Sequence, residues 1–287
     1  MPNSQSIHIP VTTSPTLFPI LGTQKPFLKW AGGKSQMIND LLKFAPNDFD
    51  KYIEPFIGGG ALYFSLNHSN CIISDLNEEL VITYKQVKEN VHEILGILST
   101  YQNSETFFYQ IRSLEAKKLS EVERAARLIY LNKTCFNGLY RVNKKGEFNV
   151  PYGKRTGLFY NSETLLRASE YLQNTEIYHL DYKETLKRFA AKGDFIFLDP
   201  PYQPVGKYSD FKRYTKEFFY EKDQIELANL FQELTYKGCY VMLTNSDHPF
   251  ILDLYKDFHI EIIETKRLIS SNPNTRTGKD IIVLGGL

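Results

Sequence analysis

Asp194-Phe195-Ile196-Phe197-Leu198 is a short, mainly apolar run that leads directly into Asp199-Pro200-Pro201-Tyr202. Such a run predicts a buried β-strand, so the sequence places an acid at the carboxyl end of that strand. In open α/β sheets this is the edge at which ligands bind. The two prolines lack backbone N–H groups and stiffen the turn, which leaves carbonyl groups there as hydrogen-bond acceptors.

Two interpretations of Asp199–Tyr202 are open from these residues alone. A carboxylate, a carbonyl and an aromatic ring on a rigid turn suit a flat ligand with an exocyclic amino group. The two acceptors would bind the amino protons, and the ring would stack on the ligand. The same residue types also favour ordinary turns, so a strand-ending turn with a surface tyrosine is the alternative.

The bulk composition limits the classes of protein that remain. The chain has 287 residues, enough for one large α/β domain with an inserted module or for two domains. Its formal net charge is +1, so any basic surface for nucleic acid must be local. Three widely spaced cysteines and six scattered histidines predict neither a disulfide framework nor a metal site. No apolar run approaches the length of a membrane span, and the N-terminus lacks the blocks of a signal peptide. We therefore expect a cytoplasmic protein without a metal.

Strand and helix signals alternate over most of the chain. Six further strands are predicted, at Tyr52–Ile57, Cys71–Asp75, Ile177–Asp181, Cys239–Thr244, Ile260–Thr265 and Asp280–Leu284. This alternation predicts an α/β fold with a mostly parallel sheet that is covered on both faces. The last two strands are joined by a loop without a helix, which predicts an antiparallel edge.

The alternation stops between Asn77 and about Arg155, which indicates an inserted module. This part of the sequence is helical at first, with helical periodicity from Asn77 to Asn90. Ser120 and Glu123 have the spacing of a capping box before a helix that runs through Lys133.

The insert continues into Asn137–Pro151, which has the pattern of a β-hairpin. Basic residues gather in and around it, opposed only by Glu147: Lys133, Arg141, Lys144, Lys145, Lys154 and Arg155. A basic patch on a narrow β-ribbon suits the major groove of duplex DNA. A solvated hairpin with solubilising lysines is the alternative.

A glycine cluster follows the first predicted strand, and an acid ends the second. Gly58-Gly59-Gly60 would let the backbone approach a nucleoside, and Asp75 would bind the two ribose hydroxyls. Tyr63 stands where the dinucleotide fingerprint needs a small residue, which disfavours NAD. The alternative is a glycine-rich turn beside a solvated Asp75.

Gly33-Lys34-Ser35 has the ending of a phosphate-binding loop. The first glycine of that motif would fall at Leu28, so ATP hydrolysis is not predicted. We expect Lys34 to pair with a carboxylate of the protein or of a ligand. Trp30 is expected to be either a hydrophobic anchor or a stacking wall.

Taken together, these motifs resemble the Dam-type DNA adenine-N6 methyltransferases, in the alpha arrangement of that family. Phe27–Lys34 is similar to the family's N-terminal cofactor motif, and Glu54–Gly60 to its S-adenosylmethionine motif. Further along the chain, Asn137–Pro151 is similar to the DNA-reading hairpin, Asp199–Tyr202 to the catalytic motif and Arg267–Arg276 to a late loop. The resemblance covers the chain from Phe27 to its end, and the preceding residues have no counterpart.

The resemblance implies a Rossmann-like methyltransferase sheet with an inserted helical and β-hairpin DNA-recognition domain. The expected division is a flexible N-terminal arm over 1–25, a catalytic domain over 26–76 and 163–287, and a target-recognition domain over 77–162.

Site residues carry over by matching positions. The implied cofactor-binding residues are Trp30, Lys34, Phe56, Gly58, Asp75, Asp181 and Asp199. The implied catalytic residues are Asp199, Pro200, Pro201 and Tyr202. The implied DNA-binding residues are Lys29 and Arg141 as guanine readers, Leu139 and Pro151 as thymine contacts, and Phe136 and Asn137. Asn137 matches a backbone or orphan-base contact, and Phe136 stands where some relatives have tyrosine, so any hydroxyl contact is lost.

The implied reaction transfers a methyl group from S-adenosyl-L-methionine to N6 of an adenine flipped out of duplex DNA, most commonly in GATC. We expect a monomer that acts on a GATC or other GAT-containing site. The sequence does not decide whether a cognate restriction endonuclease accompanies it. The alternatives are a catalytically silent DNA-binding regulator with the same fold and a methyltransferase of RNA or protein. Intact Asp199, Tyr202 and Lys34 favour catalysis, and the basic hairpin favours duplex DNA.

Overall fold

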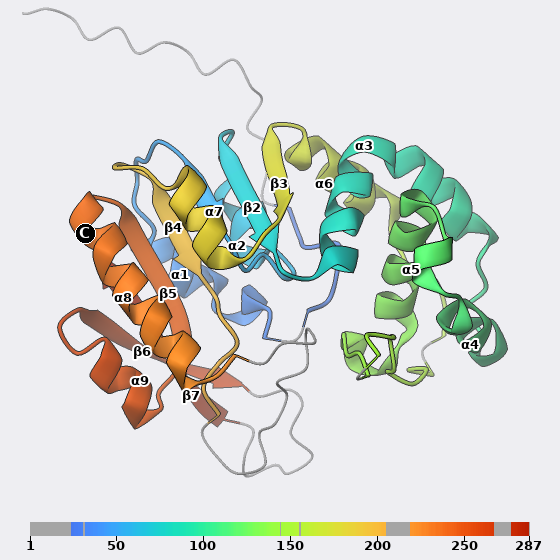
Figure 1. The fold of residues 1–287 in the computed structure, drawn as a ribbon. Coiled ribbons are helices and arrows are strands. Elements are labelled where there is room, and N and C mark those ends of the chain that lie inside the picture. The colour runs from blue at the N-terminus through green and yellow to red at the C-terminus, as the bar shows by residue number, and fades with distance from the viewer. Residues whose placement is uncertain are drawn as a thin grey trace, which may run out of the picture.

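The computed structural model describes residues 24–30, 32–143, 145–154, 156–204, 219–266 and 277–286. Within these residues, seven strands form one sheet in the order β3-β2-β1-β4-β5-β7-β6 (Figure 1). The strands are β1 Tyr52–Glu54, β2 Cys71–Asp75, β3 Thr175–His179, β4 Phe195–Leu198, β5 Tyr240–Ser246, β6 His259–Lys266 and β7 Thr277–Gly285. β7 runs antiparallel to β5 and β6, and the other neighbouring pairs are parallel. The predicted mostly parallel sheet with an antiparallel edge is confirmed.

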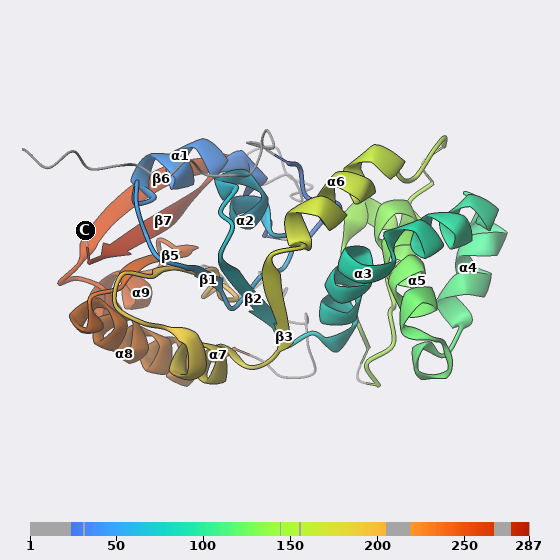
Figure 2. The same cartoon turned by 90° about the horizontal axis from the view of Figure 1, so that it is seen from above.

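Helices cover both faces of the sheet (Figure 2). Side chains of β4 alternate between two apolar clusters, with Phe195 and Phe197 in one and Ile196 and Leu198 in the other. Burial on both faces explains why this strand is a continuous apolar run. The first cluster includes residues of α1 Ile38–Phe44 and α2 Ala61–Leu66, and the second includes residues of α7 Tyr182–Phe189, α8 Glu221–Lys237 and α9 Pro249–Leu254.

The insert fills the crossover between β2 and β3 and lies beside the β3 edge of the sheet (Figure 1). Its helices are α3 Glu78–Thr100, α4 Glu105–Ser113, α5 Glu121–Thr134 and α6 Ser162–Leu172, with the 3₁₀ turns η2 Ala116–Lys118 and η3 Phe136–Gly138. α3 packs against both α5 and α6. Apolar residues of these helices belong to the same cluster as one face of the sheet, so the insert shares the core of the sheet.

The boundaries of α3 and α5 follow local chemistry. The capping box is confirmed, because the Ser120 N–H donates to Glu123 Oε2 over 2.9 Å and the Glu123 N–H donates back to the Ser120 hydroxyl. The helix predicted to end near Asn90 continues to Thr100 through a kink at Asn90, where φ is −132°.

Two strands end before their predicted last residues. β1 ends at Glu54 because Pro55 has no N–H to donate to a neighbouring strand. β3 ends at His179, and Asp181, predicted as the last strand residue, instead caps α7 by accepting a hydrogen bond from the Lys183 N–H.

The Asn137–Pro151 segment is a hairpin without a regular ladder. Its antiparallel contacts are an isolated bridge between Val142 and Phe148 and a bond from the Asn149 N–H to the Arg141 carbonyl, 3.0 Å long. Buried side chains, including those two bridging residues, hold the hairpin against the helices. Lys144, predicted near the tip, lies outside the described residues.

At its N-terminal end the fold extends to Gln24, which we had placed in the arm. Gln24 is 5 % exposed, and its side chain donates to the Thr164 carbonyl at the start of α6. The remainder of the predicted arm, 1–23, lies outside the described residues.

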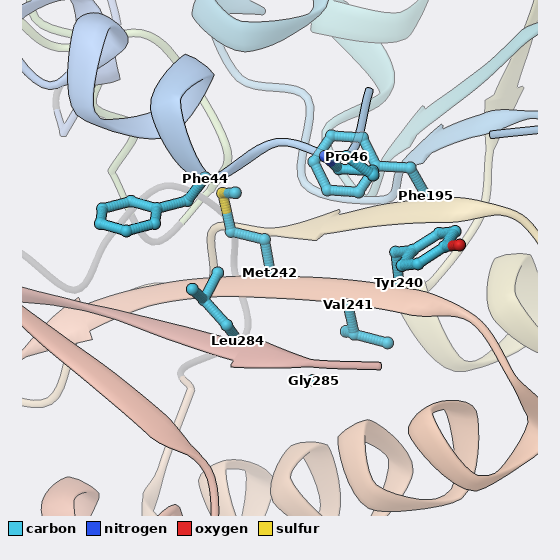
Figure 3. A pocket seen from close by; sticks show the side chains of 8 residues that line it. All are labelled: Phe44, Pro46, Phe195, Tyr240, Val241, Met242, Leu284 and Gly285. Atoms are coloured by element: carbon cyan, nitrogen blue, oxygen red, sulfur yellow. The ribbon is translucent and has the colours of Figure 1, made fainter. Parts of the chain in front are cut away.

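An apolar crevice lies at the opposite edge of the sheet (Figure 3). It is lined by Phe44, Pro46, Phe195, Tyr240, Val241, Met242, Leu284 and Gly285. Phe195 begins β4, whereas Asp199 follows its last residue, so this crevice is remote from the catalytic motif. Across the described part of the chain, helices fall short of the length and apolar character that a bilayer span requires.

Candidate active site

Three strands of the sheet end at the same edge with polar or glycine-rich residues. β1 leads into Gly58–Gly60, β2 ends in Asp75, and β4 leads into Asp199. Between β1 and β4 the chain changes the direction in which it adds strands, which is the topological switch point where α/β sheets bind ligands. The fold thus brings together three features that are far apart in the sequence.

Lys34 forms an ion pair with Asp199 at the centre of this edge. Its Nζ lies 2.7 Å from Asp199 Oδ1, and the side chains are 6 % and 18 % exposed. The Thr244 hydroxyl at the end of β5 donates to the same oxygen over 2.8 Å. Lys34 Nζ also lies over the Tyr202 ring, 4.6 Å from its centroid. The expected pairing of Lys34 with a carboxylate is confirmed, and the carboxylate belongs to the catalytic motif.

A buried amide network holds the turn after Asp199. Gln224, fully buried on α8, donates to the Pro201 carbonyl over 3.0 Å and accepts from Asn245 Nδ2 over 3.1 Å. Asn245 Oδ1 in turn accepts from the Gln203 N–H, and the Ser246 hydroxyl donates to the Gln203 carbonyl. Rigidity of the turn therefore comes from α8 and β5 as well as from its prolines.

Trp30 lies against the glycine turn. A Cβ added to Gly58 would lie 2.8 Å from Trp30 Cδ1, so only glycine leaves room for the indole ring. Gly58 also has φ of +44°, a conformation that disfavours other residues. The indole also stacks on Tyr140 of the insert, with 5.0 Å between ring centroids. Trp30 is thus a stacking residue between the cofactor motif and the insert.

Asp75 accepts two backbone hydrogen bonds next to the glycine turn. Its Oδ2 binds the Gly58 N–H at 3.2 Å, and its Oδ1 binds the Asn77 N–H at 2.9 Å. Burial, partly offset by these bonds, raises the pKa of Asp75 to about 6. The residue is partly exposed, so Asp75 is an acid that is bound to the glycine turn and still accessible from one side.

A second carboxyl, Glu54, lies beneath the ion pair and is 2 % exposed. It accepts a hydrogen bond from the Tyr52 hydroxyl over 2.7 Å. Burial, with a smaller contribution from the negative charge of Asp199, raises its pKa well above the usual range. The group therefore favours its neutral form, which limits the negative charge close to Asp199.

Phe56 and Asp181 border the same edge on the α7 side. Phe56 stacks on Tyr182, with 5.1 Å between ring centroids, and its edge contacts Phe219. Asp181 is adjacent to Tyr182 and caps α7, which places it beside this aromatic group. Its carboxylate contacts none of the other predicted site residues through a hydrogen bond or ion pair within the described residues.

Lys29 is packed against the insert beside Lys133. Burial, together with the charge of Lys29, lowers the pKa of Lys133 to about 8. Two ammonium groups close together form a local positive site on a chain of nearly neutral net charge. Phe136 is 50 % exposed, and Asn137 is exposed with φ of +56°.

Arg141 is exposed and oriented by Asn149. Its Nε donates to Asn149 Oδ1 over 2.8 Å, and its Nη2 donates to the Asn149 carbonyl over 3.2 Å. Leu139 is partly exposed, and Pro151 is exposed with its carbonyl bound to the Phe136 N–H. The six predicted DNA-binding residues therefore lie on neighbouring segments. Arg155 and the late loop Arg267–Arg276 lie outside the described residues.

Sequence reasoning missed several residues of this edge. Thr244 is the last residue of a predicted strand and Asn245 follows it, so the rule that ligands bind at carboxyl ends would have found them. Tyr140 stands between two predicted DNA contacts and faces inward. Gln224 and Asn132 act through contacts with residues distant in sequence, for which no local pattern exists.

Comparison with known proteins agrees with this site. The family model of the D12 class N6 adenine-specific DNA methyltransferases matches residues 30–269. The chain is 41 % identical over 261 residues to the Type II methyltransferase M1.LlaDCHI of Lactococcus lactis subsp. cremoris, covering 88 % of this chain and 92 % of that protein. It is 39 % identical over 275 residues to the Type II methyltransferase M.MjaIII of Methanocaldococcus jannaschii, covering 88 % and 95 %. It is 30 % identical over 260 residues to the DNA adenine methylase of Escherichia coli K12, covering 89 % and 93 %. The chain therefore belongs to the D12 class of N6 adenine-specific DNA methyltransferases.

Proposed function

We propose that this chain transfers a methyl group from S-adenosyl-L-methionine to N6 of an adenine flipped out of duplex DNA, within GATC or another GAT-containing site. The observation that carries the proposal is the Lys34–Asp199 ion pair at the carboxyl edge of the sheet, with Lys34 Nζ over the Tyr202 ring. We further propose the domain division given above, with residues 77–162 as the recognition domain. The enzyme would act as a monomer on DNA in the cytoplasm.

The residues at this edge fit the proposed methyl donor. Among the described residues, an added Cβ at Gly32 would have Lys34 Nζ as its near neighbour, 4.0 Å away, so these residues leave room beside this backbone. Asp75 keeps acceptor capacity beyond its two backbone bonds, because a carboxylate has about four lone-pair sites. Trp30, Phe56, Gly58 and Asp181 would form the remaining wall. When bound, the donor supplies an electrophilic methyl group on a sulfonium.

The catalytic turn would hold the adenine amino group with two acceptors. Among the described residues, the contacts of Asp199 go to Oδ1, so we assign Oδ2 to one N6 proton. Gln224 already binds the Pro201 carbonyl, so we assign the Pro200 carbonyl to the other proton. This pairing directs the nitrogen lone pair away from both acceptors, towards the methyl group.

Tyr202 and Lys34 support that geometry. Lys34 Nζ lies over the Tyr202 ring, and we assign this ring to stacking on the extruded base. Lys34 also fixes the orientation of the Asp199 carboxylate, which would share the positive charge that develops on N6. Alignment of this kind can contribute about 7–11 kcal/mol, and extrusion of the base costs a few kcal/mol.

Methylation assays test the reaction. We expect N6-methyladenine in duplex DNA incubated with the protein and labelled donor, and sequencing of the modified bases gives the site. Asp199→Ala should abolish transfer while duplex binding is retained, whereas Asp257→Ala, an exposed acid, should retain transfer. Binding without any methylated base in the wild-type reaction would instead identify a silent DNA-binding regulator.

A second assay tests sequence reading by Arg141. Arg141→Ala should relax discrimination at one base pair by about 1–3 kcal/mol, as expected for loss of a bidentate guanine contact. Lys145→Ala, an exposed cation at the tip of the same hairpin, should weaken binding to all sites by a similar factor. Discrimination that is unchanged in Arg141→Ala across a panel of substituted sites would refute the assignment.

A further inference from the structure

Asn132 joins three segments of the chain with one buried side chain. It lies on α5 and is fully buried. Its Oδ1 accepts from the Lys29 N–H over 2.9 Å, and its Nδ2 donates to the Lys29 carbonyl over 2.6 Å. The same Nδ2 donates to the Gly138 carbonyl at 3.3 Å. Asn132 therefore ties the segment before Lys34 to the turn that begins the hairpin.

Side chains reinforce this joint on both sides. A Cβ on Gly138 would lie 2.5 Å from Lys29 Cδ, so the aliphatic part of Lys29 lies directly against this glycine. Two residues later, Tyr140 stacks on Trp30, the neighbour of Lys29. The two segments are thus in contact over successive residues, although they are about a hundred residues apart in the chain.

The joint sets the spacing between residues expected to read DNA. Lys29 is on one side, and Leu139 and Arg141 are on the other. Nothing in the local chain fixes the distance between them, because they belong to separate elements. A fully buried Asn132 cannot contact DNA itself, so any effect of it on recognition must pass through these neighbours.

We propose that Asn132 is a positioning residue for sequence recognition, which holds Lys29 in register with Leu139 and Arg141 so that they read adjacent base pairs together. This inference rests on the proposed DNA-reading role of those three residues. The chemistry requires an amide, because the joint needs one acceptor for the Lys29 N–H and donors for two carbonyls. Alanine would remove all three of these hydrogen bonds.

The test measures discrimination by equilibrium binding. The preferred site of the wild-type chain is first selected from a library of random duplexes, and affinities are then measured for that site and for its single base-pair substitutions. We expect Asn132→Ala to lower the ratio of preferred to substituted affinity by about tenfold or more at the base pair that Lys29 reads, with a smaller change elsewhere. Thr134→Ala is the matched control, because Thr134 is buried on the same helix and its hydroxyl donates only within that helix, to the Tyr130 carbonyl.

A double variant separates positioning from general damage to the fold. If Asn132 acts through Lys29, then Lys29→Ala should reduce discrimination much less in the Asn132→Ala background than in the wild type. Equal weakening at every site, or additive effects of the two substitutions, would overturn the inference. Should Asn132→Ala fail to fold, the same measurements on Asn132→Ser, which keeps a hydroxyl in the joint, decide the question.

The same design distinguishes this inference from the proposed reaction. If the wild-type chain discriminates between duplexes but methylates none of them, the proposed reaction is refuted. The affinity ratios of the Asn132 variants then still test the positioning role of Asn132. A wild-type chain that selects no sequence would overturn the inference as well.

Discussion

Replacing Asp75 with asparagine should make the stability of the protein less dependent on pH. Folding raises the pKa of this carboxyl from 3.8 to about 6. Between these two values the folded state binds more protons than the unfolded state, so wild-type stability falls as pH rises through this range. The difference of about two pH units corresponds to about 3 kcal/mol once Asp75 is fully ionised. Asparagine does not ionise and escapes this penalty.

Asparagine also loses a hydrogen bond. Its single side-chain oxygen can accept from the Asn77 N–H, but its amide group cannot accept from the Gly58 N–H as Asp75 Oδ2 does. That loss costs about 1–3 kcal/mol, and it is independent of pH. At neutral pH the variant and the wild type should therefore differ little in free energy of unfolding, whereas this difference should change strongly with pH. Relative to the wild type, the unfolding free energy of the variant should rise by about 2 kcal/mol between pH 4.5 and pH 7.5.

Urea denaturation across this pH range measures that change directly. Asp253→Asn is the control, because Asp253 is 75 % exposed and should give a difference that barely depends on pH. The reasoning about burial would be refuted if the difference between Asp75→Asn and the wild type were constant from pH 4.5 to pH 7.5. The same variant should bind the methyl donor more weakly if Asp75 holds the ribose.

Two further substitutions test how the site is supported. Gln224→Leu leaves the Pro201 carbonyl and the Asn245 amide without their buried partner, so we expect the free energy of unfolding in urea to fall by about 2–4 kcal/mol. Single-turnover methylation should be slower at unchanged DNA affinity. A methylation rate equal to that of the wild type would contradict a supporting role for Gln224. Gly60→Ala should lose at least about 1 kcal/mol in thermal unfolding, because φ is +67° and the new Cβ would lie 2.9 Å from the Tyr84 hydroxyl. Its control, Gly96→Ala on α3, has no atom within 4 Å of the new Cβ and should gain about 0.5–1 kcal/mol; equal effects at both glycines would refute the strain argument.

The turns at the carboxyl edge of the sheet could be predicted because they depend on local sequence. The apolar run before Asp199 and the glycines after β1 determine where the chain turns, and the parallel arrangement then brings these turns to one edge. The pairing of Lys34 with a carboxylate was predicted from charge alone, but its partner was not. A buried cation needs an anion, yet the sequence does not show which of many acids is near.

The contacts between the insert and the sheet could not be predicted. Asn132 contacts Lys29 across 103 residues, and no periodicity or spacing marks such a pair. Gln224 is similar, because one amide within an amphipathic helix has the pattern of a surface residue although it is fully buried. The hairpin itself was predicted, but its sparse strand pairing could not be, because the same alternation also serves packing, and side chains such as Phe148 hold the hairpin in place.

The position of the insert has a consequence for how specificity can change. It replaces a single crossover between β2 and β3, which are adjacent in the sheet, so the chain leaves and returns through neighbouring strands. The insert is therefore joined to the sheet by one crossover, although its helices share an apolar core with one face of that sheet. Under the proposed domain division, exchange of the insert should redirect the same chemistry to another sequence, provided that the new insert supplies an amide for the Lys29 backbone and a ring for Trp30.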